Sequence, residues 1–455
     1  MRKYRHVLSL SLCILILVSL FSSLASANTF TAFEDWAADY DTYKNDSRQI
    51  ALSPGSDESE MGFAWLSSPL DLNPAFKYSS DKNLKNAKRA EVATSLTPIG
   101  QLSNKVNLKG LKKGSVYYYS YTIEGVWSEA YSFKTGAGDN FKALLVADSQ
   151  IGRSGDERDD EVLCRDSFGW NNTLEVALGS FPDTDFILSA GDQVESAYSN
   201  DQYNLFFAPA TLRSIPVAAA LGNHDFYFPL YKYRFNNPNE FEGELIESPA
   251  GSGFWFTRGQ ALFIVIDSNI PFPLRQEKLI EDAVKANPNA LWRIVMMHHS
   301  IYGAYGGEAR TDNLWRFYAP IFDRTEIDLV LSGHDHAHCR TLPIKGGKVV
   351  DYGQGTVYLS ANSSSGSKFG REPAETPWYA AGCTQPKAAC FSLLGFEEGK
   401  ITINSYRADS MERIDEELVL EKTAPSPELK QLTPFERFLE SIFTFLMVMK
   451  ASIKV

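Results

Sequence analysis

The sequence predicts two structured regions, an N-terminal β-sandwich and a larger α/β domain behind it. Residues 50–133 lack long helical periodicity and show the alternation of short strands. After a linker at Gly136–Asp139, apolar strands alternate with helices, and clusters of polar residues follow five of the strands. The 455 residues are 44% hydrophobic, which is enough apolar material for two cores and excludes a disordered chain.

The first 27 residues have the pattern of a signal peptide. Basic residues within positions 2–6 precede an apolar run at 7–20, and Ala25–Ala27 supplies the small residues of a cleavage site. The apolar run is short for spanning a bilayer, which disfavours the alternative of a permanent anchor. We therefore expect an exported protein (secreted, periplasmic or at the cell surface) whose mature chain starts at Asn28.

The overall charge argues against nucleic acid as an obligate partner. The chain has 44 Lys and Arg residues against 56 Asp and Glu, a net charge of −12, and so lacks the basic surplus that holds a phosphate backbone. Only seven histidines occur, and six of them fall in three short clusters. Because histidine is the commonest metal ligand and proton-transfer group, this clustering predicts a metal site.

Four cysteines remain after the signal peptide: Cys164, Cys339, Cys383 and Cys390. An oxidising compartment allows disulfides, and no CxxC pair is present. Cys383 and Cys390 lie seven residues apart in a loop, so we expect these two to pair, while the other two either pair or stay buried as thiols. Four cysteines allow three pairings, and the sequence alone leaves all three open.

The first structured region, residues 45–137, follows a lead segment at 28–44. In its clearest strand, alternate residues share one face: Tyr117, Tyr119, Tyr121 and Ile123. About ninety residues of short strands and turns predict a small β-sandwich, with Leu108–Leu111 and the tyrosines placed as in a fibronectin type III corner.

The second region, residues 138–410, is expected to be α/β. Its predicted strands cover 143–147, 186–189, 217–221, 292–297 and 327–331, and its predicted helices include 170–178, 276–286 and 313–322. A tail at 411–455 contains an apolar stretch, Phe438–Met449. That stretch predicts either an interfacial helix in peripheral contact with a membrane or cell wall, or a helix that docks on the domain surface.

Each of the five strands ends in a polar cluster. The clusters are Asp148–Gln150, Gly191–Gln193, Gly222–Asp225, His298–His299 and Gly333–His336. In α/β sheets the ligand-binding loops lie at the carboxyl ends of the strands, so we expect all five clusters to meet at one sheet edge. Their carboxylate, amide and imidazole groups suit two adjacent ions, Fe, Mn or Zn.

These five motifs, in this order, resemble the calcineurin-like metallophosphoesterase superfamily. The β-sandwich in front, with its YYYSYTIEGVWSEAYSFKT stretch, makes the chain most similar to the purple acid phosphatase branch. The resemblance covers residues 45–410. It implies a catalytic domain in which two sheets pack between helical layers, an α/β/β/α sandwich, behind a fibronectin III-like domain.

The resemblance also implies a dinuclear metal centre. Asp148 and His336 would bind the first ion and Asp192 would bridge both ions. Three further residues would bind the second ion: Asn223, His298 and His334. Where the purple branch has a metal-bound tyrosine this chain has Glu195, and Gln150 stands where the superfamily usually has histidine or glycine. We favour Gln150 as the remaining ligand of the first ion, with Glu195 as the alternative.

The remaining candidate residues surround the predicted ions. His224 resembles the family's proton donor to the leaving group, and Asp225 either orients the His224 imidazole or caps a turn. Four further residues are expected to support the ligands or to contact substrate: His299, His338, Arg153 and Tyr302.

The expected function is that of an exported, acid phosphatase-like phosphoesterase, which hydrolyses small phosphate esters by in-line attack of a metal-bound hydroxide. A phosphodiesterase or nucleotidase using the same site is one alternative. A surface binding module with vestigial hydrolysis is another. A serine hydrolase is excluded because the chain has no GxSxG motif. The sequence does not predict an oligomeric state.

Overall fold

The computed structural model of the chain describes residues 30–241, 248–269, 273–305 and 314–429. The predicted signal peptide and the apolar stretch Phe438–Met449 lie outside these residues. Within the described residues, every helix is too short or too polar to cross a bilayer.

The lead segment forms a helix that packs on the catalytic domain. Helix α2 (Phe33–Asn45) contacts α3 (Asp160–Ser180) and α4 (Asn200–Phe207). Trp36 is buried, and its indole Nε1 donates to Ser167 Oγ at 3.1 Å. The helix that precedes the β domain in sequence therefore belongs to the core that follows it.

The N-terminal β domain consists of two sheets, as predicted. One has the order β1-β2-β6-β5, and the other has the order β4-β3-β7-β8, with β9 paired to β7. The strands are β1 (Ala51–Pro54), β2 (Met61–Ser67), β3 (Phe76–Ser79), β4 (Lys88–Ala90), β5 (Ala93–Leu96), β6 (Leu102–Leu108), β7 (Val116–Ile123), β8 (Val126–Trp127) and β9 (Tyr131–Lys134). The alternate residues predicted to share a face of β7 do pack together in the core between these sheets.

The outer face of the β1-β2-β6-β5 sheet docks on the catalytic domain at α5 (Leu230–Arg234) and the loop that follows it. Ser103 Oγ donates to the Tyr233 carbonyl at 2.8 Å, and Asn236 Nδ2 donates to Asn107 Oδ1 at 2.9 Å. A Cβ atom on Gly62 would lie 2.5 Å from the Asn236 carbonyl oxygen, so only glycine allows this close approach.

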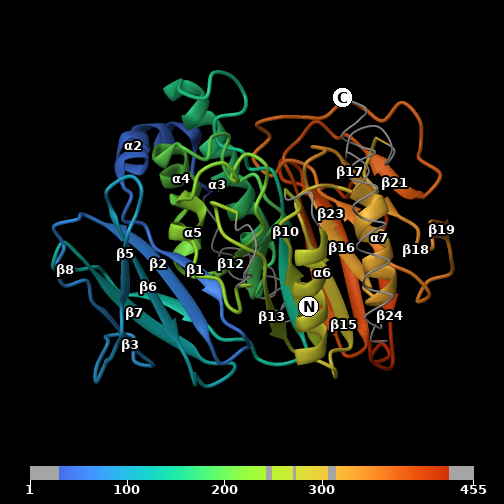
Figure 1. Cartoon of the computed structure of the whole chain (residues 1–455). Coiled ribbons are helices and arrows are strands. Elements are labelled where there is room, and N and C mark those ends of the chain that lie inside the picture. The colour runs from blue at the N-terminus through green and yellow to red at the C-terminus, as the bar shows by residue number, and fades with distance from the viewer. Residues whose placement is uncertain (1–29, 242–247, 270–272, 306–313, 430–455) are drawn as a thin grey trace, which may run out of the picture. The chain divides into compact units, whose positions relative to one another are not determined.

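The catalytic domain is a four-layer sandwich, α/β/β/α, as predicted (Figure 1). A six-stranded sheet, β12-β11-β10-β22-β23-β24, packs face to face against a seven-stranded sheet, β13-β14-β15-β16-β20-β17-β21. The first sheet contains β10 (Phe141–Val146), β11 (Phe186–Ser189), β12 (Val217–Ala219), β22 (Cys390–Glu397), β23 (Lys400–Arg407) and β24 (Leu418–Glu421). The second contains β13 (Phe254–Arg258), β14 (Ala261–Val265), β15 (Trp292–Met296), β16 (Leu329–Ser332), β17 (His338–Thr341), β20 (Val357–Ser360) and β21 (Ala380–Thr384). Two short strands, β18 (Ile344–Lys345) and β19 (Lys348–Val349), form a separate ribbon.

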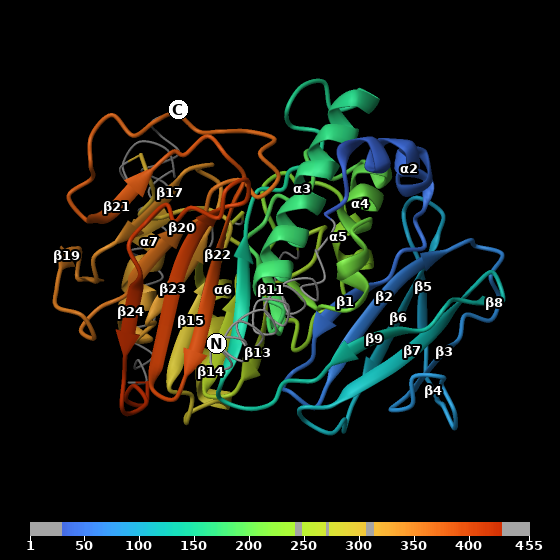
Figure 2. The same cartoon turned by 180° about the vertical axis from the view of Figure 1, so that it is seen from behind.

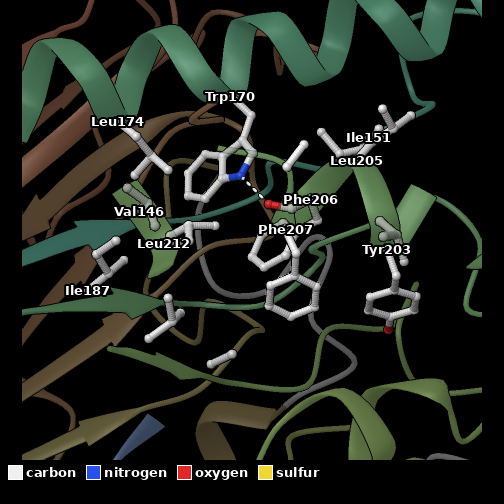
Figure 3. Close-up of a cluster of buried hydrophobic side chains, with 14 of the residues drawn as sticks. Val146, Ile151, Trp170, Leu174, Ile187, Tyr203, Leu205, Phe206, Phe207 and Leu212 are labelled. Atoms are coloured by element: carbon white, nitrogen blue, oxygen red, sulfur yellow. Dashed lines mark hydrogen bonds between the residues drawn. The ribbon is translucent and has the colours of Figure 1, made fainter. Parts of the chain in front are cut away.

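Helices cover the outer face of each sheet. On the six-stranded sheet, α3 buries Trp170, whose ring stacks on Phe206 at 5.2 Å and whose Nε1 donates to the Phe206 carbonyl at 2.9 Å (Figure 3). On the seven-stranded sheet lie α6 (Pro273–Ala286) and α7 (Leu314–Arg324). A short 3-10 turn, Ala210–Arg213, joins α4 to β12.

The six-stranded sheet continues beyond residue 410, where we expected the tail to begin. Strand β24 pairs antiparallel with β23, with Ile403 opposite Leu418. Lys422 Nζ then forms an ion pair with Asp328 Oδ1 at 2.7 Å. Seen from behind, β22, β23 and β24 lie side by side (Figure 2). Residues 411–422 are thus part of the catalytic domain.

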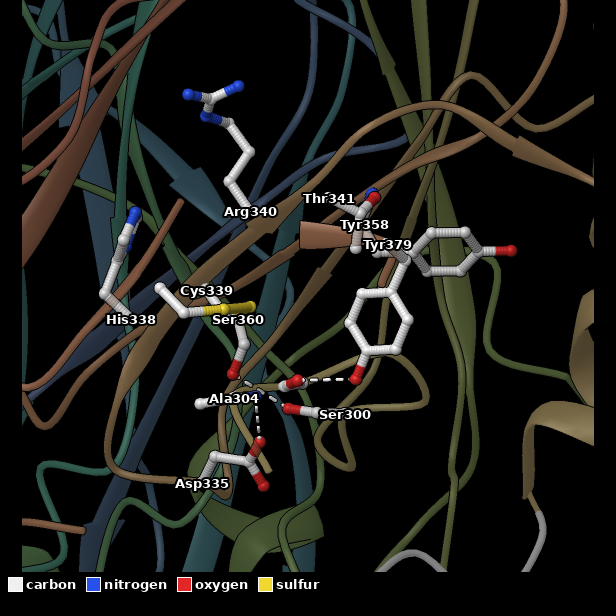
Figure 4. Close-up of a disulfide and its surroundings, with 12 residues drawn as sticks. Ser300, Ala304, Asp335, His338, Cys339, Arg340, Thr341, Tyr358, Ser360 and Tyr379 are labelled. Carbon is white, nitrogen blue, oxygen red and sulfur yellow. Dashed lines mark hydrogen bonds between the residues drawn. A yellow bond between two sulfur atoms is a disulfide. The ribbon is translucent and has the colours of Figure 1, made fainter. Parts of the chain in front are cut away.

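The expected disulfide between Cys383 and Cys390 is wrong. Cys383 is bonded to Cys339, its direct neighbour across the β17-β21 pair (Figure 4). Cys390 begins β22, which belongs to the other sheet, so its short separation in sequence from Cys383 does not bring the two sulfurs together. Cys390 and Cys164 are buried free thiols.

Candidate metal centre

The five polar clusters converge as predicted, but they come from two sheets instead of one. Asp148, Asp192 and Asn223 follow β10, β11 and β12 of the six-stranded sheet. His298 and His334 follow β15 and β16 of the seven-stranded sheet. The carboxyl ends of these parallel strands meet where the two sheets face each other, and there the side chains come together.

Five of the predicted metal ligands have a backbone in the left-handed region, with φ between 36° and 72°: Asp148, Gln150, Asp192, His334 and His336. Non-glycine residues adopt this conformation at a cost, and only where their surroundings fix it. Here hydrogen bonds between the strand-end loops do so, from Asp148 N to Gly191 O at 3.0 Å and from Gln150 N to Asp192 O at 2.8 Å.

Asp148, Asp192 and His298 form the centre of the site. All three are buried, and one ligand atom from each lies within 4.8 Å of the others. Burial alone would raise the pKa of Asp192, but the charge and hydrogen bond of His298, whose Nε2 lies 3.2 Å from Asp192 Oδ2, hold it below its usual range. Burial raises the pKa of Asp148 to about 8. Burial therefore disfavours the charged form of Asp148, and a bound cation would stabilise that form.

Asn223 lies between His298 and His334. Its Oδ1 is 3.1 Å from His298 Nε2 and 3.1 Å from His334 Nδ1, and the two imidazole nitrogens are 3.2 Å apart. His298 Nδ1 lies 2.9 Å from the carbonyl of Ala190, which can only accept, so Nδ1 carries the proton. In the neutral imidazole, Nε2 of His298 then has a free lone pair. This lone pair faces Asn223 Oδ1 and His334 Nδ1, as a metal-binding nitrogen requires.

His336 lies beside Asp148, with its Nε2 3.6 Å from Asp148 Oδ1. Its Nδ1 is 3.2 Å from the Lys368 carbonyl and therefore carries the proton. Burial lowers the pKa of His336 to about 3 and that of His334 to about 2. Both imidazoles are neutral near pH 7, which is the form that binds metal ions.

The two unusual positions, Gln150 and Glu195, contact each other. Gln150 Nε2 donates to Glu195 Oε2 at 2.8 Å, and Arg153 Nη1 pairs with Glu195 Oε1 at 2.7 Å. Both oxygens of the Glu195 carboxylate are therefore engaged. Gln150 Oε1, in contrast, is buried and has no hydrogen-bond partner among the described residues. A buried amide oxygen without a partner is costly unless something binds it, and a metal ion would.

His224 and Asp225 have separate environments, so the expected contact between them is wrong. His224 Nδ1 lies 2.8 Å from the Glu195 carbonyl oxygen, which fixes the ring. Asp225 is fully buried and accepts hydrogen bonds from Gly222 N, from Gln193 N and from the Tyr203 hydroxyl. The turn-cap alternative describes Asp225 better.

The other predicted residues divide into two groups. His299 supports the centre, with Nδ1 2.8 Å from Ser268 Oγ and its ring 4.5 Å from that of His334. Tyr302 has a packing role: it is 5% exposed and lies between the rings of Tyr358 and Tyr379, at 4.8 and 5.1 Å. Its neighbours come from distant strands, which the sequence around Tyr302 does not reveal.

His338 is buried away from the ligands, beside the disulfide (Figure 4). Its Nε2 lies 3.2 Å from Asp415 Oδ2, and Arg340 Nε donates to the same oxygen at 2.6 Å. Burial alone would raise the pKa of Asp415, but these two hydrogen bonds hold it well below its usual range. This cluster fixes the segment after β23 to β17.

An Asp415→Asn variant should lose stability in a pH-dependent way. A carboxyl whose pKa is lower in the folded state stabilises the fold above its unfolded pKa of about 3.9, and this contribution disappears as the pH falls through the folded value. We expect a loss of about 2 kcal/mol at pH 7 that shrinks steadily below pH 4. Urea unfolding of both proteins at several pH values measures it, and a difference independent of pH would contradict the ion-pair explanation.

Sequence reasoning missed the polar groups that support the loops from behind. Ser363 Oγ donates to the Asp148 carbonyl at 2.8 Å, and Ser365 Oγ donates to the Ser149 carbonyl at 2.6 Å. Gln385 Nε2 donates to the carbonyl of His336. The serine run at Ser363–Ser365 was the available signal, since such a run has no reason to be buried unless it satisfies backbone groups.

Two family models match the chain. Residues 141–338 match the calcineurin-like phosphoesterase domain, and residues 47–135 match the purple acid phosphatase N-terminal domain. A search of curated proteins finds no significant match.

Solved structures share the fold at low sequence identity. The purple acid phosphatase PPD1 from yellow lupin (Lupinus luteus) seeds aligns with a TM-score of 0.64 and 14% identity, over 85% of this chain and 77% of that one. The structure of PhoD aligns with a TM-score of 0.55 and 11% identity, over 90% and 99%. The chain therefore carries, in this order, a purple acid phosphatase N-terminal domain and a calcineurin-like phosphoesterase domain, and it shares the fold of a purple acid phosphatase.

Proposed function

We propose that the protein is an exported, dinuclear metal-dependent phosphoesterase of the acid phosphatase type, acting on small phosphorylated substrates. The observation that carries the proposal is the buried, unpartnered Oε1 of Gln150 beside a cluster of carboxylates and imidazoles. A metal ion bound by Gln150 Oε1 together with these carboxylates and imidazoles would satisfy this oxygen.

The donor set fits two ions of the Fe, Mn or Zn class. Three residues would hold the first ion: Asp148, Gln150 and His336. The second ion would be held by Asn223, His298 and His334, with Asp192 shared between the two. When bound, two such ions lower the pKa of water and neutralise charge on a phosphoryl group, which is the chemistry that phosphate ester hydrolysis needs.

The protein's own residues supply the proton. His224 is 26% exposed, and because its Nδ1 faces the Glu195 carbonyl, its Nε2 is left to donate a proton to the departing alcohol oxygen. Glu195 acts as a positioning residue for His224 through its carbonyl and for Gln150 through its carboxylate, and Arg153 balances its charge.

This assignment predicts a colourless enzyme. Glu195 replaces the tyrosine whose bond to iron gives the purple branch its colour, and a carboxylate supplies no comparable charge-transfer band. The iron-loaded protein should show no strong visible absorption, which a spectrum of the purified holo-protein checks. An intense visible absorption band would contradict the ligand assignment.

Two observations support export. The signal-like pattern of residues 1–27 is one of them. The other is the Cys339–Cys383 disulfide, because such bonds persist in oxidising compartments and are rare in the cytosol.

A substrate panel on metal-free and metal-loaded protein tests the function. We expect hydrolysis of phosphate monoesters after loading with Mn, Zn or Fe, and loss of hydrolysis on chelation. A clear preference for diesters over monoesters would indicate the phosphodiesterase alternative. Stoichiometric metal without turnover of any ester would favour a binding module and would refute the proposal.

A further inference from the structure

Two loops of the candidate site carry exposed aromatic rings. Tyr198 is 63% exposed and follows Glu195 by three residues, and Tyr227 is 67% exposed and follows His224 by three residues. Three residues of chain span at most about 10 Å, so both tyrosines begin close to the proposed proton donor.

The two loops are joined at the site. The contact between the Glu195 carbonyl and His224 Nδ1, 2.8 Å long, connects them beside the ligands. A ring contact connects them again further out, where Tyr198 and Phe228 lie 4.8 Å apart between centroids and are tilted by 33°. Phe228 packs in turn against the buried core under α3 and α4. The Tyr198 ring is therefore held by Phe228, while most of the Tyr198 side chain remains exposed to solvent.

Single exposed aromatic residues are common and need no explanation. Here one exposed ring, that of Tyr198, is supported by Phe228 from the neighbouring loop, and Tyr227, next to Phe228 in the chain, adds a second exposed ring on the loop that holds the proton donor. An aromatic ring held in place offers a large flat contact area at little cost in side-chain entropy. The partner that matches it is another flat ring.

We propose that Tyr198, Tyr227 and Phe228, named here the aromatic shelf, bind a flat aromatic ring in the leaving group of the ester. The proposal rests on the proposed function, because it places the leaving group on the His224 side of the site. During hydrolysis a water molecule releases one proton to solvent as its oxygen bonds to phosphorus, the bond from phosphorus to the leaving oxygen breaks, and that oxygen takes the His224 proton; a solvent proton then restores His224. The ring on the departing alcohol then lies against the aromatic shelf.

Two kinds of substrate share this chemistry. An aryl phosphate carries its ring directly on the ester oxygen, and a nucleoside monophosphate carries its base one sugar further away. Glycerol phosphate has no ring and serves as the reference ester.

The first experiment compares kcat/KM for phenyl phosphate, a nucleoside 5′-monophosphate and glycerol phosphate in metal-loaded wild type, Tyr198→Ala and Tyr227→Ala. The ratio of a ring ester to glycerol phosphate should fall about tenfold in Tyr198→Ala, the size expected for one lost stacking contact. Taking each ratio relative to wild type cancels the different intrinsic reactivity of the esters. Tyr198→Phe should keep the wild-type ratio, and Tyr352→Ala, at a tyrosine that is 50% exposed on the loop after β19, is the control.

The second experiment measures binding without turnover. Calorimetry should show metal-loaded wild type binding phenylphosphonate about tenfold more tightly than methylphosphonate, and Tyr198→Ala should lose most of this difference. The proposal for the aromatic shelf is overturned if the kcat/KM ratio of ring ester to glycerol phosphate is unchanged in both tyrosine variants. It is also overturned if kcat/KM falls equally for ring and ringless esters. If no ester is hydrolysed but the phosphonate preference is present and depends on Tyr198, the proposed function fails and the shelf stands. A loss confined to phenyl phosphate identifies the aryl ester as the fitting substrate, and a loss confined to the nucleotide identifies the base.

Discussion

Replacing Asp192 with asparagine is expected to reduce kcat/KM by at least about 10³-fold. The Asp192 carboxylate is 2% exposed and lies at the centre of the site, where Oδ1 accepts from the His224 backbone N–H at 2.9 Å and Oδ2 faces His298. Asparagine has the same shape, so the fold should survive. The negative charge that offsets repulsion between two nearby cations is lost, and the second ion should bind much more weakly.

Metal content and activity must be measured together on this variant. We expect the wild type to hold two ions per chain and Asp192→Asn to hold one or fewer under the same loading. Asp415→Asn makes the same change at a partly buried aspartate that contacts none of the proposed ligands in the described hydrogen bonds, and it should keep both ions and near-normal kcat/KM. Wild-type activity in Asp192→Asn would rule out its role as the shared ligand.

Replacing Asp225 with alanine is expected to destabilise the fold by about 3–5 kcal/mol. The substitution leaves three donors without an acceptor in a fully buried place: the Gly222 and Gln193 amides and the Tyr203 hydroxyl. Asp225→Asn is the matched control, because its Oδ1 can still accept from the amides while its Nδ2 can donate to the Tyr203 oxygen. We expect that variant to lose about 1.5 kcal/mol or less.

The pH dependence of Asp225→Asn separates burial from hydrogen bonding. Burial raises the pKa of Asp225 to about 7, above its unfolded value of about 3.9. Between these values the folded state binds more protons, so the wild type loses stability as the pH rises from 4 to 7, and the asparagine variant does not. Urea unfolding of the metal-free proteins should therefore show that the free energy of unfolding of Asp225→Asn rises relative to that of the wild type as the pH rises. A constant difference would contradict the raised pKa.

The sequence predicted those parts of the site that local pattern determines. An apolar strand followed by Asp, Asn or His is visible within ten residues, and all five such strands end where expected. The side-chain partners of these residues were harder to predict. Tyr203 reaches Asp225 from α4, and the two rings that enclose Tyr302 come from β20 and from just before β21.

The disulfide and the lead helix show the same limit on a larger scale. Neighbouring cysteines in sequence were assigned to each other, although the chain moves from one sheet to the other between them. Helix α2 was not predicted because only Trp36 and Tyr40 of its thirteen residues are buried. Two buried residues give too weak a helical periodicity of apolar positions to predict a helix. In both cases the deciding contact joins residues far apart in the chain.

Helix α2 has a consequence for synthesis. Its buried indole bonds to a serine 131 residues downstream, and the whole β domain is made in between. At roughly 5–20 residues per second, translation leaves α2 without its binding surface for about 10 s. The β domain can close during that interval, whereas the catalytic core cannot. The nascent chain therefore exposes the Trp36 face to chaperones during this interval, and a helix that is made early is among the last to reach its packing surface.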